Sequence, residues 1–164
     1  MTIPSVLPRI RTLLLADPAV SARTEDRIFV GRPPATLVSQ MPISAVSISG
    51  LGGPAEMYLP LHRWRVQVVC YGGRKTAYDT DVDAHYLALE VYEALHQRQA
   101  FVEGNVKFGS ILLVSGPTQM RDPDLKDAPA ELLIFSVYAC TVPVVRGIAV
   151  TEAAGFGDAL LVQS

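Results

Sequence analysis

The sequence predicts an α+β domain in which a mostly antiparallel sheet of four or five strands is covered on one face by two helices. The predicted elements follow the order helix, strands, long helix, strands, without the βαβ alternation that builds parallel sheets. Of the 164 residues, 49% are hydrophobic and 18% are charged, which is a globular composition. This length is sufficient to bury a core without disulfides or metals. We therefore expect one domain over residues 1–145, and a C-terminal tail over 146–164 that orders only on assembly.

The N-terminal part is predicted to contain one helix and two short strands. An apolar stripe at helical spacing begins after Ser5, and the sequence Ala-Asp-Pro closes it. The residues RIFVG at 27–31 predict a short strand, and the prolines after them predict an extended connection. The alternating ISAVSIS at 43–49 predicts the next strand. The helical stripe consists of Val6, Ile10, Leu13 and Leu14.

The rest of the chain is predicted to place a long helix between strands. In RWRVQVVCY at 63–71, apolar and polar residues alternate, so we expect one face of this strand to lie in the core and the other to meet solvent or an interface. Residues 80–99 carry two apolar lines of a helix that packs broadly on the sheet. Strands over 106–115 and 130–145 follow, separated by turn-rich residues. The last strand is apolar on both faces, which favours a central position or cover by a neighbouring subunit.

Charge and cysteine content argue against several classes of protein. The net charge of -2 and the pI near 5.9 predict no basic surface for nucleic acid, so sequence-specific DNA binding is not expected. Arg9 and Arg11 precede a short apolar run, but Asp17 and Pro18 stop it before the length of a signal peptide. No stretch is long enough to cross a membrane. Two cysteines cannot build a disulfide framework, and both lie in predicted strands as buried thiols, so we expect a reduced protein of the cytoplasm.

The sequence DTDVDAHYLALE at 79–90 has the acidic spacing of a calcium-binding EF-hand loop. That loop requires Gly at its sixth position, where this chain has Ala84, and an incoming helix, where this chain has a predicted strand. The alternative is that an early residue such as Thr80 or a neighbouring aspartate caps the long helix, whose positive end the carboxylates favour. We prefer capping and expect no metal here. The acidic residues are Asp79, Asp81, Asp83 and Glu90.

Three other patterns give no support for a catalytic or cofactor site. GLGGPA at 50–55 fits the dinucleotide fingerprint G-x-G-x-x-A, but the prolines after it predict a loop leading into a strand instead of the required helix. His85 and His96 lie about 16 Å apart on one helix, too far to share a metal. The aspartates of RDPDLKD at 121–127 predict a solvated loop. With no nucleophile signature either, we expect no catalytic, cofactor-binding or metal-binding residue and no enzyme activity.

The residues LLLADPAVSARTEDRIFVGRPP at 13–34 resemble the tail terminator, or tail completion, proteins of long-tailed bacteriophages. Members of that family open with a short helix that runs into paired leucines, a proline and a valine, followed by a charged turn and an R-I-F/Y strand. The order of the later strands and of the helix with VYEALHQ is also similar, so the resemblance covers roughly residues 5–145. The tail after Arg146 has no counterpart. The matching residues are Leu14, Leu15, Pro18, Val20, Arg27, Ile28, Phe29 and Pro33.

This resemblance implies a non-enzymatic assembly protein of the virion tail or neck, assembled in the host cytoplasm. Such proteins form a ring, usually a hexamer, on the head-proximal end of the tail tube, stop its polymerisation and present a surface to the head connector. The implied partners are other copies of the chain, the major tail tube protein and the head connector protein. Turn-rich stretches outside the core predict the contact residues Leu51, Glu56, Arg121, Asp124, Lys126, Arg146 and Phe156. Two alternatives stay open: another head-tail connector or adaptor protein, and a small-molecule-binding α+β domain.

Overall fold

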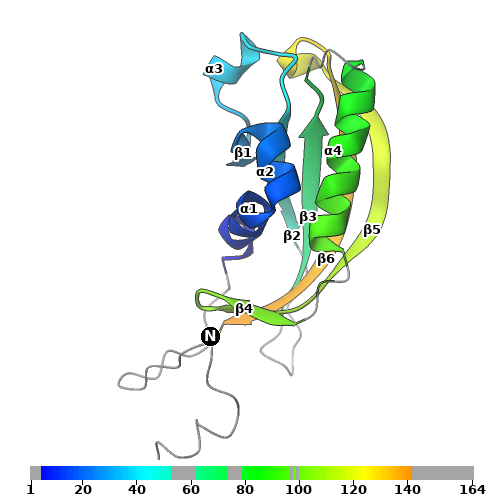
Figure 1. Ribbon diagram of the computed structural model, residues 1–164. Helices are drawn as coiled ribbons and strands as arrows, with labels where there is room; N and C mark the ends of the chain where they lie inside the picture. Colours follow the sequence, from blue (N-terminus) through cyan, green and yellow to red (C-terminus); the bar gives the residue numbers. More distant parts are fainter. Residues whose placement is uncertain (1–4, 53–61, 74–78, 97, 99, 142–164) are drawn as a thin grey trace, which may run out of the picture.

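The computed structural model describes residues 5–52, 62–73, 79–96, 98 and 100–141. These residues form one curved sheet of six strands with helices on both faces (Figure 1). The strands lie in the spatial order β1-β2-β3-β6-β5-β4. Their bounds are β1 (Ile28–Val30), β2 (Ala45–Gly52), β3 (His62–Tyr71), β4 (Phe101–Glu103), β5 (Val106–Asp122) and β6 (Ala128–Thr141).

The α+β class is confirmed, but the sheet is larger and less uniform than predicted. It has six strands where four or five were expected, and β1 runs parallel to β2 while the other described pairs are antiparallel. The parallel pair arises because the chain after β1 passes through α3 (Ala35–Val38) before β2 starts beside Ile28. β4 has only three residues, too few to show alternation in the sequence, and its tight turn to β5 uses Gly104 at φ +61°.

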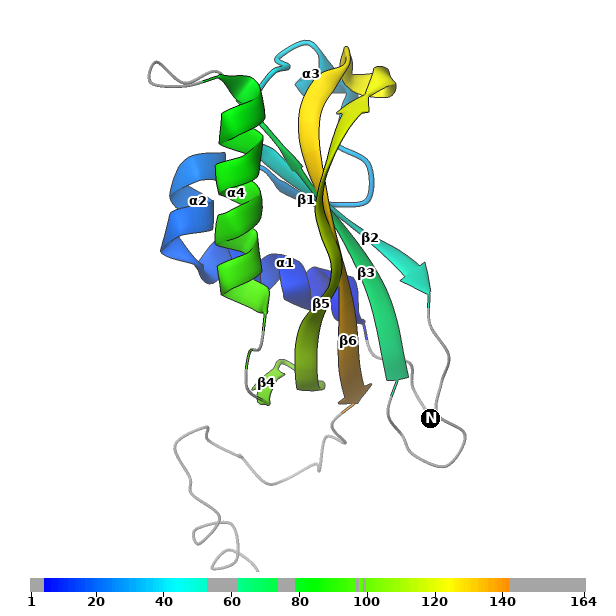
Figure 2. The same cartoon turned by 90° about the vertical axis from the view of Figure 1, so that its right-hand side faces the viewer.

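Three helices cover one face of the sheet, where two were predicted (Figure 2). The unpredicted helix exists because Asp17 both ends the first helix and starts the second. Its carboxylate accepts hydrogen bonds from the backbone N–H groups of Ala19 and Val20 at 3.0 and 3.1 Å, and Pro18 fits the first turn. The Asp-Pro pair is therefore a start signal as well as a stop signal. The three helices are α1 (Val6–Ala16), α2 (Pro18–Thr24) and α4 (Thr80–Leu95).

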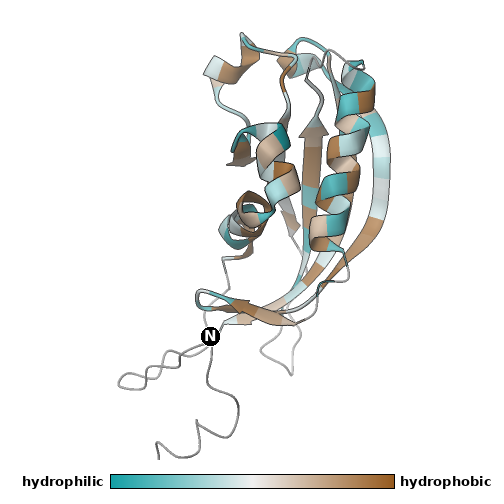
Figure 3. Ribbon diagram, viewed as in Figure 1, coloured by the Kyte–Doolittle hydropathy of each residue, from teal (hydrophilic) through white to brown (hydrophobic). Residues whose placement is uncertain are grey.

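The main core lies between these helices and the sheet. In Figure 3 hydrophobic colour covers much of β3, behind the helices. The predicted alternation of β3 is confirmed, since Val66, Val68 and Cys70 all point into this core. Cys70 is buried as expected, whereas Cys140 is only half-buried. The largest side chains that the fold buries completely include Phe108, Phe135, Ile10, Leu14, Ile28, Ile48, Leu87 and Leu95.

The opposite face of the sheet, which we call the outer face, is covered at one end only. There Leu37 of α3 and Leu125 of the 3-10 helix η1 (Pro123–Leu125) pack with Val69 and Tyr71 in a second, smaller cluster. Successive side chains of β3 point to opposite faces of the sheet, so neighbouring residues belong to different hydrophobic clusters. Toward the other end, no described helix packs on the outer face (Figure 2).

β5 and β6 form a long hairpin, which corrects the prediction of a turn-rich segment over 116–129. β5 continues past residue 115 to Asp122, and β6 begins at Ala128. Register shifts interrupt the β5–β6 ladder at three places, and one of them accommodates Gly116 and Pro117. Glycine and proline therefore mark irregularities within a strand here, and only η1 and the residues just after it form the turn.

A buried carboxylate joins four elements of the fold. Asp83, in the first turn of α4, is 0% exposed. Its Oδ2 accepts hydrogen bonds from Ser44 Oγ at 2.5 Å and from the backbone N–H of Gly73 at 2.6 Å, while its Oδ1 accepts one from Nη1 of Arg23 at 2.8 Å. The same guanidinium binds both carboxylate oxygens of Glu90 at 2.8 Å. We call this arrangement the Asp83 clamp. It holds α4, α2, the start of β2 and the end of β3 together, and its bonds offset the cost of burying the charge.

The clamp requires two glycines after β3. A Cβ at Gly72 would lie 1.8 Å from the carbonyl oxygen of Thr80, and a Cβ at Gly73 would lie 2.6 Å from the backbone nitrogen of Ser44. Both clashes are with backbone atoms, so no side-chain movement relieves them. The pair Gly-Gly therefore lets the start of α4 approach β3 closely.

Replacing Asp83 by Ala is expected to lower the free energy of unfolding by about 3 kcal/mol, because it leaves Ser44 and Gly73 without their acceptor and removes one carboxylate from Arg23. Asp81→Ala is the matched control in the same helical turn. The Asp81 carboxylate is half-exposed and pairs with Arg121 at 3.3 Å, so its loss is expected to cost about 0.5 kcal/mol or less. Urea unfolding followed by circular dichroism measures both. Equal losses in the two variants would contradict a structural role of the clamp.

Candidate functional site

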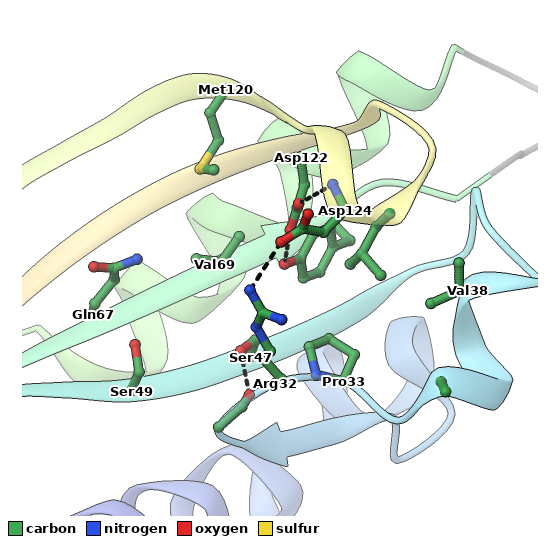
Figure 4. A pocket seen from close by; sticks show the side chains of 14 residues that line it. Arg32, Pro33, Val38, Ser47, Ser49, Gln67, Val69, Met120, Asp122 and Asp124 are labelled. Carbon is green, nitrogen blue, oxygen red and sulfur yellow. Dashed lines mark hydrogen bonds and ion pairs between the residues drawn. The ribbon is translucent and has the colours of Figure 1, made fainter.

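A cavity of about 660 Å³ opens on the outer face of the sheet, beside the second cluster (Figure 4). We call it the outer cavity. β2 and β3 form its floor, the segment from Gly31 to Val38 forms one wall, and the end of β5 with η1 forms the other. The cavity exists because the β5–β6 hairpin and α3 both extend over one end of an otherwise uncovered sheet face.

The outer cavity combines apolar walls with an uncharged polar floor. Ser47, Ser49 and Gln67 point into it from the floor, and the Ser47 hydroxyl donates a hydrogen bond to the carbonyl oxygen of Gly31 at 2.7 Å. The apolar lining comprises Pro33, Ala35, Val38, Val69, Met120 and Leu125. Apolar lining with a few hydrogen-bonding groups is typical of surfaces that receive an uncharged ligand or peptide side chain.

An ion pair crosses the rim of the outer cavity. Nη2 of Arg32 lies 2.9 Å from Oδ2 of Asp124, linking the β1–α3 segment to η1. The two side chains are 87% and 67% exposed, so solvent screens the attraction and the pair contributes at most about 1 kcal/mol. A partner with its own charged groups can therefore displace this ion pair at small cost.

A stronger contact fixes the hairpin wall to the floor. The Tyr71 hydroxyl donates a hydrogen bond to Oδ2 of Asp122 at 2.9 Å, and Oδ1 of Asp122 accepts one from the backbone N–H of Asp124 at 3.0 Å. Burial raises the pKa of Tyr71 well above its ordinary value, and the hydrogen bond and negative charge of Asp122 raise it further. The phenol therefore stays protonated and keeps its hydrogen bond at neutral pH.

The lining of the outer cavity gives no catalytic arrangement. It contains no histidine, cysteine or lysine, so neither serine has a base beside it in the lining. Its two carboxylates are engaged by Tyr71 and Arg32. Across the described ranges, no three His, Cys, Asp or Glu side chains gather closely enough to hold a metal ion. The lining itself offers hydrogen-bonding groups and apolar contact area.

The predicted contact residues of the hairpin lie at its tip, in two neighbouring places. Asp124 lines the outer cavity. Arg121 and Lys126 line a smaller hollow of about 200 Å³, where Arg121 faces Asp81 of α4 and donates to the carbonyl oxygen of Asp127 at 3.4 Å. The hairpin thus brings three of the predicted residues together, although the predicted loop is mostly strand.

The other predicted contact residues do not join them. Leu51 lies at the far end of β2, where its side chain is 52% exposed. The remaining three fall outside the described residues, as do most of the predicted 50–58 loop and the 146–164 tail. They are Glu56, Arg146 and Phe156.

The acidic residues of the 79–90 pattern point in different directions. Asp81 faces Arg121, and Asp83 and Glu90 belong to the clamp. Asp79 occupies the N-cap position of α4, but no side chain makes a capping hydrogen bond there, so the prediction of a side-chain cap is wrong. The carboxylates in the first turn still suit the positive end of the helix.

Sequence reasoning missed the partners of His85 and of His96, and His96 lies just after the end of α4 instead of within the predicted helix. Nδ1 of His85 lies 3.0 Å from both carboxylate oxygens of Glu131, which is 3% exposed within β6. Nδ1 of His96 accepts a hydrogen bond from the backbone N–H of Leu113 at 3.0 Å, beside a register shift of β5. The single glutamate in the apolar run AELLIF could have indicated the His85 contact from sequence, because a buried carboxylate requires a hydrogen-bonding or cationic partner.

Comparison with known proteins gives a likeness in structure only. No protein-family model matches the chain, and no curated protein sequence matches it. Thirteen chains of solved structures match. One belongs to the "Virion of native gene transfer agent (GTA) particle"; it is 15% identical, with a TM-score of 0.54, over 82% of this chain and 94% of that chain. The α+β fold described above is therefore also the fold of a chain in that particle. Separately, none of the described helices is long and apolar enough to span a bilayer.

Alkaline titration is expected to show Tyr71 ionising late. Since its folded pKa is raised, the stabilisation from its neutral hydroxyl is complete below the unfolded pKa of about 10 and declines as pH rises above it. Phenolate absorbance at 295 nm should therefore include a late step that Tyr71→Phe removes. Asp122→Asn should move this step to lower pH, because it removes the negative charge but keeps the burial. A late step that survives in Tyr71→Phe would show that another tyrosine is responsible.

Proposed function

We propose that this chain is a structural component of a phage-like virion and, more narrowly, a tail terminator. In this role it forms a ring, usually a hexamer, on the head-proximal end of the tail tube, stops tube polymerisation and presents a surface to the head connector. The observation that carries the proposal is the fold shared with a chain of a gene transfer agent virion over most of both chains. The residues at 13–34, which resemble tail terminators, support the narrower role.

The described surfaces also favour an assembly role over an enzymatic one. The outer cavity offers hydrogen-bonding groups and apolar walls without an activated nucleophile. Its rim ion pair is weak enough for a partner to open. We propose that this cavity receives a side chain or loop of the tube or connector protein, after assembly in the host cytoplasm.

Two alternatives predict different partners. A head-tail connector or adaptor protein could have the same size and fold but would bind the head, not the tube. A small-molecule-binding domain is favoured by one observation, since a cavity of about 660 Å³ falls within the usual range for ligand sites. The arrangement of partners therefore separates the alternatives better than the fold does.

Purified protein is expected to form a ring and to cap isolated tail tubes. Its mass, measured by analytical ultracentrifugation, should be a multiple of the 17.7 kDa chain. Negative-stain electron microscopy should show it at one end of the tubes, and added tube subunits should no longer elongate that end. A monomer that does not bind tail tubes would contradict the terminator proposal. Binding to emptied heads instead of tubes would favour a connector.

Ser49→Trp tests the role of the outer cavity by filling its floor. The variant should still assemble into the ring but bind tubes or heads at least about tenfold more weakly. The reason is that the indole group of the tryptophan occupies the space for the partner's side chain. Val30→Glu is the control, since Val30 is 41% exposed on β1 and does not line the cavity. A stoichiometric small molecule in native mass spectra of the wild type, absent from Ser49→Trp, would favour the ligand-binding alternative.

A further inference from the structure

The chain that leaves α4 lies along the edge of β5 that faces away from β6. β4 pairs with residues 106–108 of β5, Arg98 forms an isolated bridge with Ile111, and the side chain of His96 meets Leu113. The described residues between 96 and 103 therefore cover this edge alongside residues 106–113. Beyond them, no strand of the described chain pairs with the edge from residue 114 to residue 122.

His96 is the residue at which α4 ends and the extended chain begins. Its backbone N–H donates to the carbonyl oxygen of Tyr92 at 2.8 Å, and its φ of -69° and ψ of 137° are those of extended backbone. The imidazole is stacked on the Tyr92 ring, with 4.6 Å between the ring centroids and 20° between the planes. The helix end and the stacked ring together hold the imidazole beside β5.

The contact between His96 and Leu113 has only one possible polarity. A backbone N–H can only donate, so Nδ1 of His96, at 3.0 Å from the nitrogen of Leu113, is the acceptor and carries no proton. A register shift interrupts the β5–β6 ladder directly after Leu113. A side chain thus satisfies an edge-strand N–H at the point where the covered part of the edge ends.

Protonation of His96 would reverse the chemistry of this contact. An imidazolium donates from both ring nitrogens, so two donors would face each other across the 3.0 Å that now separates donor from acceptor. The last carbonyl groups of α4 favour a nearby cation, and the last turn of the helix has no basic residue. The neutral ring therefore suits Leu113, whereas the charged ring suits the helix end. Histidine is the side chain that ordinarily changes charge between about pH 5 and pH 8.

The other ionisable side chains around this imidazole are uncharged, exposed or engaged elsewhere. Tyr92 is the neutral ring of the stack, and Glu93 is exposed in the last turn of α4. The guanidinium of Arg98 lies over an aromatic ring of β4, and Arg9 of α1 donates to the β4–β5 turn at 3.4 Å. The residues that flank the contact on β5 are apolar, as is their cross-strand neighbour Phe135.

We propose that His96 is a pH-sensitive contact, in which the neutral imidazole holds the end of α4 against the edge of β5 and protonation releases it. In acid the Leu113 N–H loses its acceptor, so the open part of the β5 edge lengthens toward β4. Free N–H groups on an edge strand are able to pair with another extended segment. This inference goes beyond the proposed virion role and does not depend on it.

Hydrogen exchange of the Leu113 amide, followed by NMR in the full-length protein, tests the contact. Rates are measured at about pH 7.5 and about pH 5, on either side of the ordinary histidine titration, and each is corrected for the intrinsic exchange rate. The protection of Leu113 is expected to fall at least about tenfold in acid, because its hydrogen bond is lost. The amide of Val68, on the central strand β3, should keep its protection at both pH values.

Three variants identify the group responsible. His96→Asn places an amide oxygen near the position of Nδ1 and does not titrate, so the protection of Leu113 should stay high at both pH values. His96→Phe removes the acceptor, so protection should be low at both. His85→Asn removes the histidine that contacts Glu131 and should keep the wild-type fall at Leu113.

Three results would overturn the proposal. They are unchanged protection of Leu113 in the wild type, an equal fall in His96→Asn, and an equal fall at Val68, which would mean that acid loosens the whole domain. Since His96→Asn retains the acceptor, its comparison with the wild type decides the question even if His96→Phe does not fold.

Discussion

The position of α4 depends on the Asp83 clamp, and much of the remaining surface depends on α4. A buried carboxylate tolerates few geometries, because both oxygens must keep their donors. Asp83 meets donors from α2, from the residue before β2 and from the residues after β3, so the rotation of α4 about its axis is fixed. On the side of α4 away from the sheet, Val82 and Leu89 are both 39% exposed. The apolar outer line of α4 is thus a consequence of the clamp.

A second set of polar contacts fixes the tip of the β5–β6 hairpin. Tyr71 holds Asp122 from the sheet, Arg32 meets Asp124 from the β1–α3 segment, and Arg121 meets Asp81 from α4. These contacts differ in strength, since the first is partly buried and the other two are exposed. The tip therefore stays anchored at Tyr71 while its rim can exchange partners. That combination suits a recognition surface built on a rigid sheet.

Sequence patterns predicted the parts of the fold whose periodicity is long and regular. The alternation of β3 and the helical period of α4 were read correctly, because ten and sixteen residues show a period clearly. The prediction that both apolar lines of this helix pack on the sheet is only half right, since the line with Ala84 and Ala88 is buried and the line with Val82 stays exposed. The short β1–α3–β2 crossover and β4 lack that length, and Gly116 and Pro117 indicated a turn where the strand contains a bulge. At the candidate site, Asp124 was identified from composition. Its partner Arg32 is distant in sequence, and only the folded chain places the two together.

The charged side chains around α4 are mostly paired within the chain, whereas several apolar side chains stay exposed. An exposed apolar line on a helix is compatible with a partner of any kind, and so is an uncovered sheet face. Here three of the four carboxylates of α4 have cationic partners from other elements, Arg121 for Asp81 and Arg23 for both Asp83 and Glu90. These ion pairs therefore stabilise the domain itself and hold α4 against α2 and the hairpin tip.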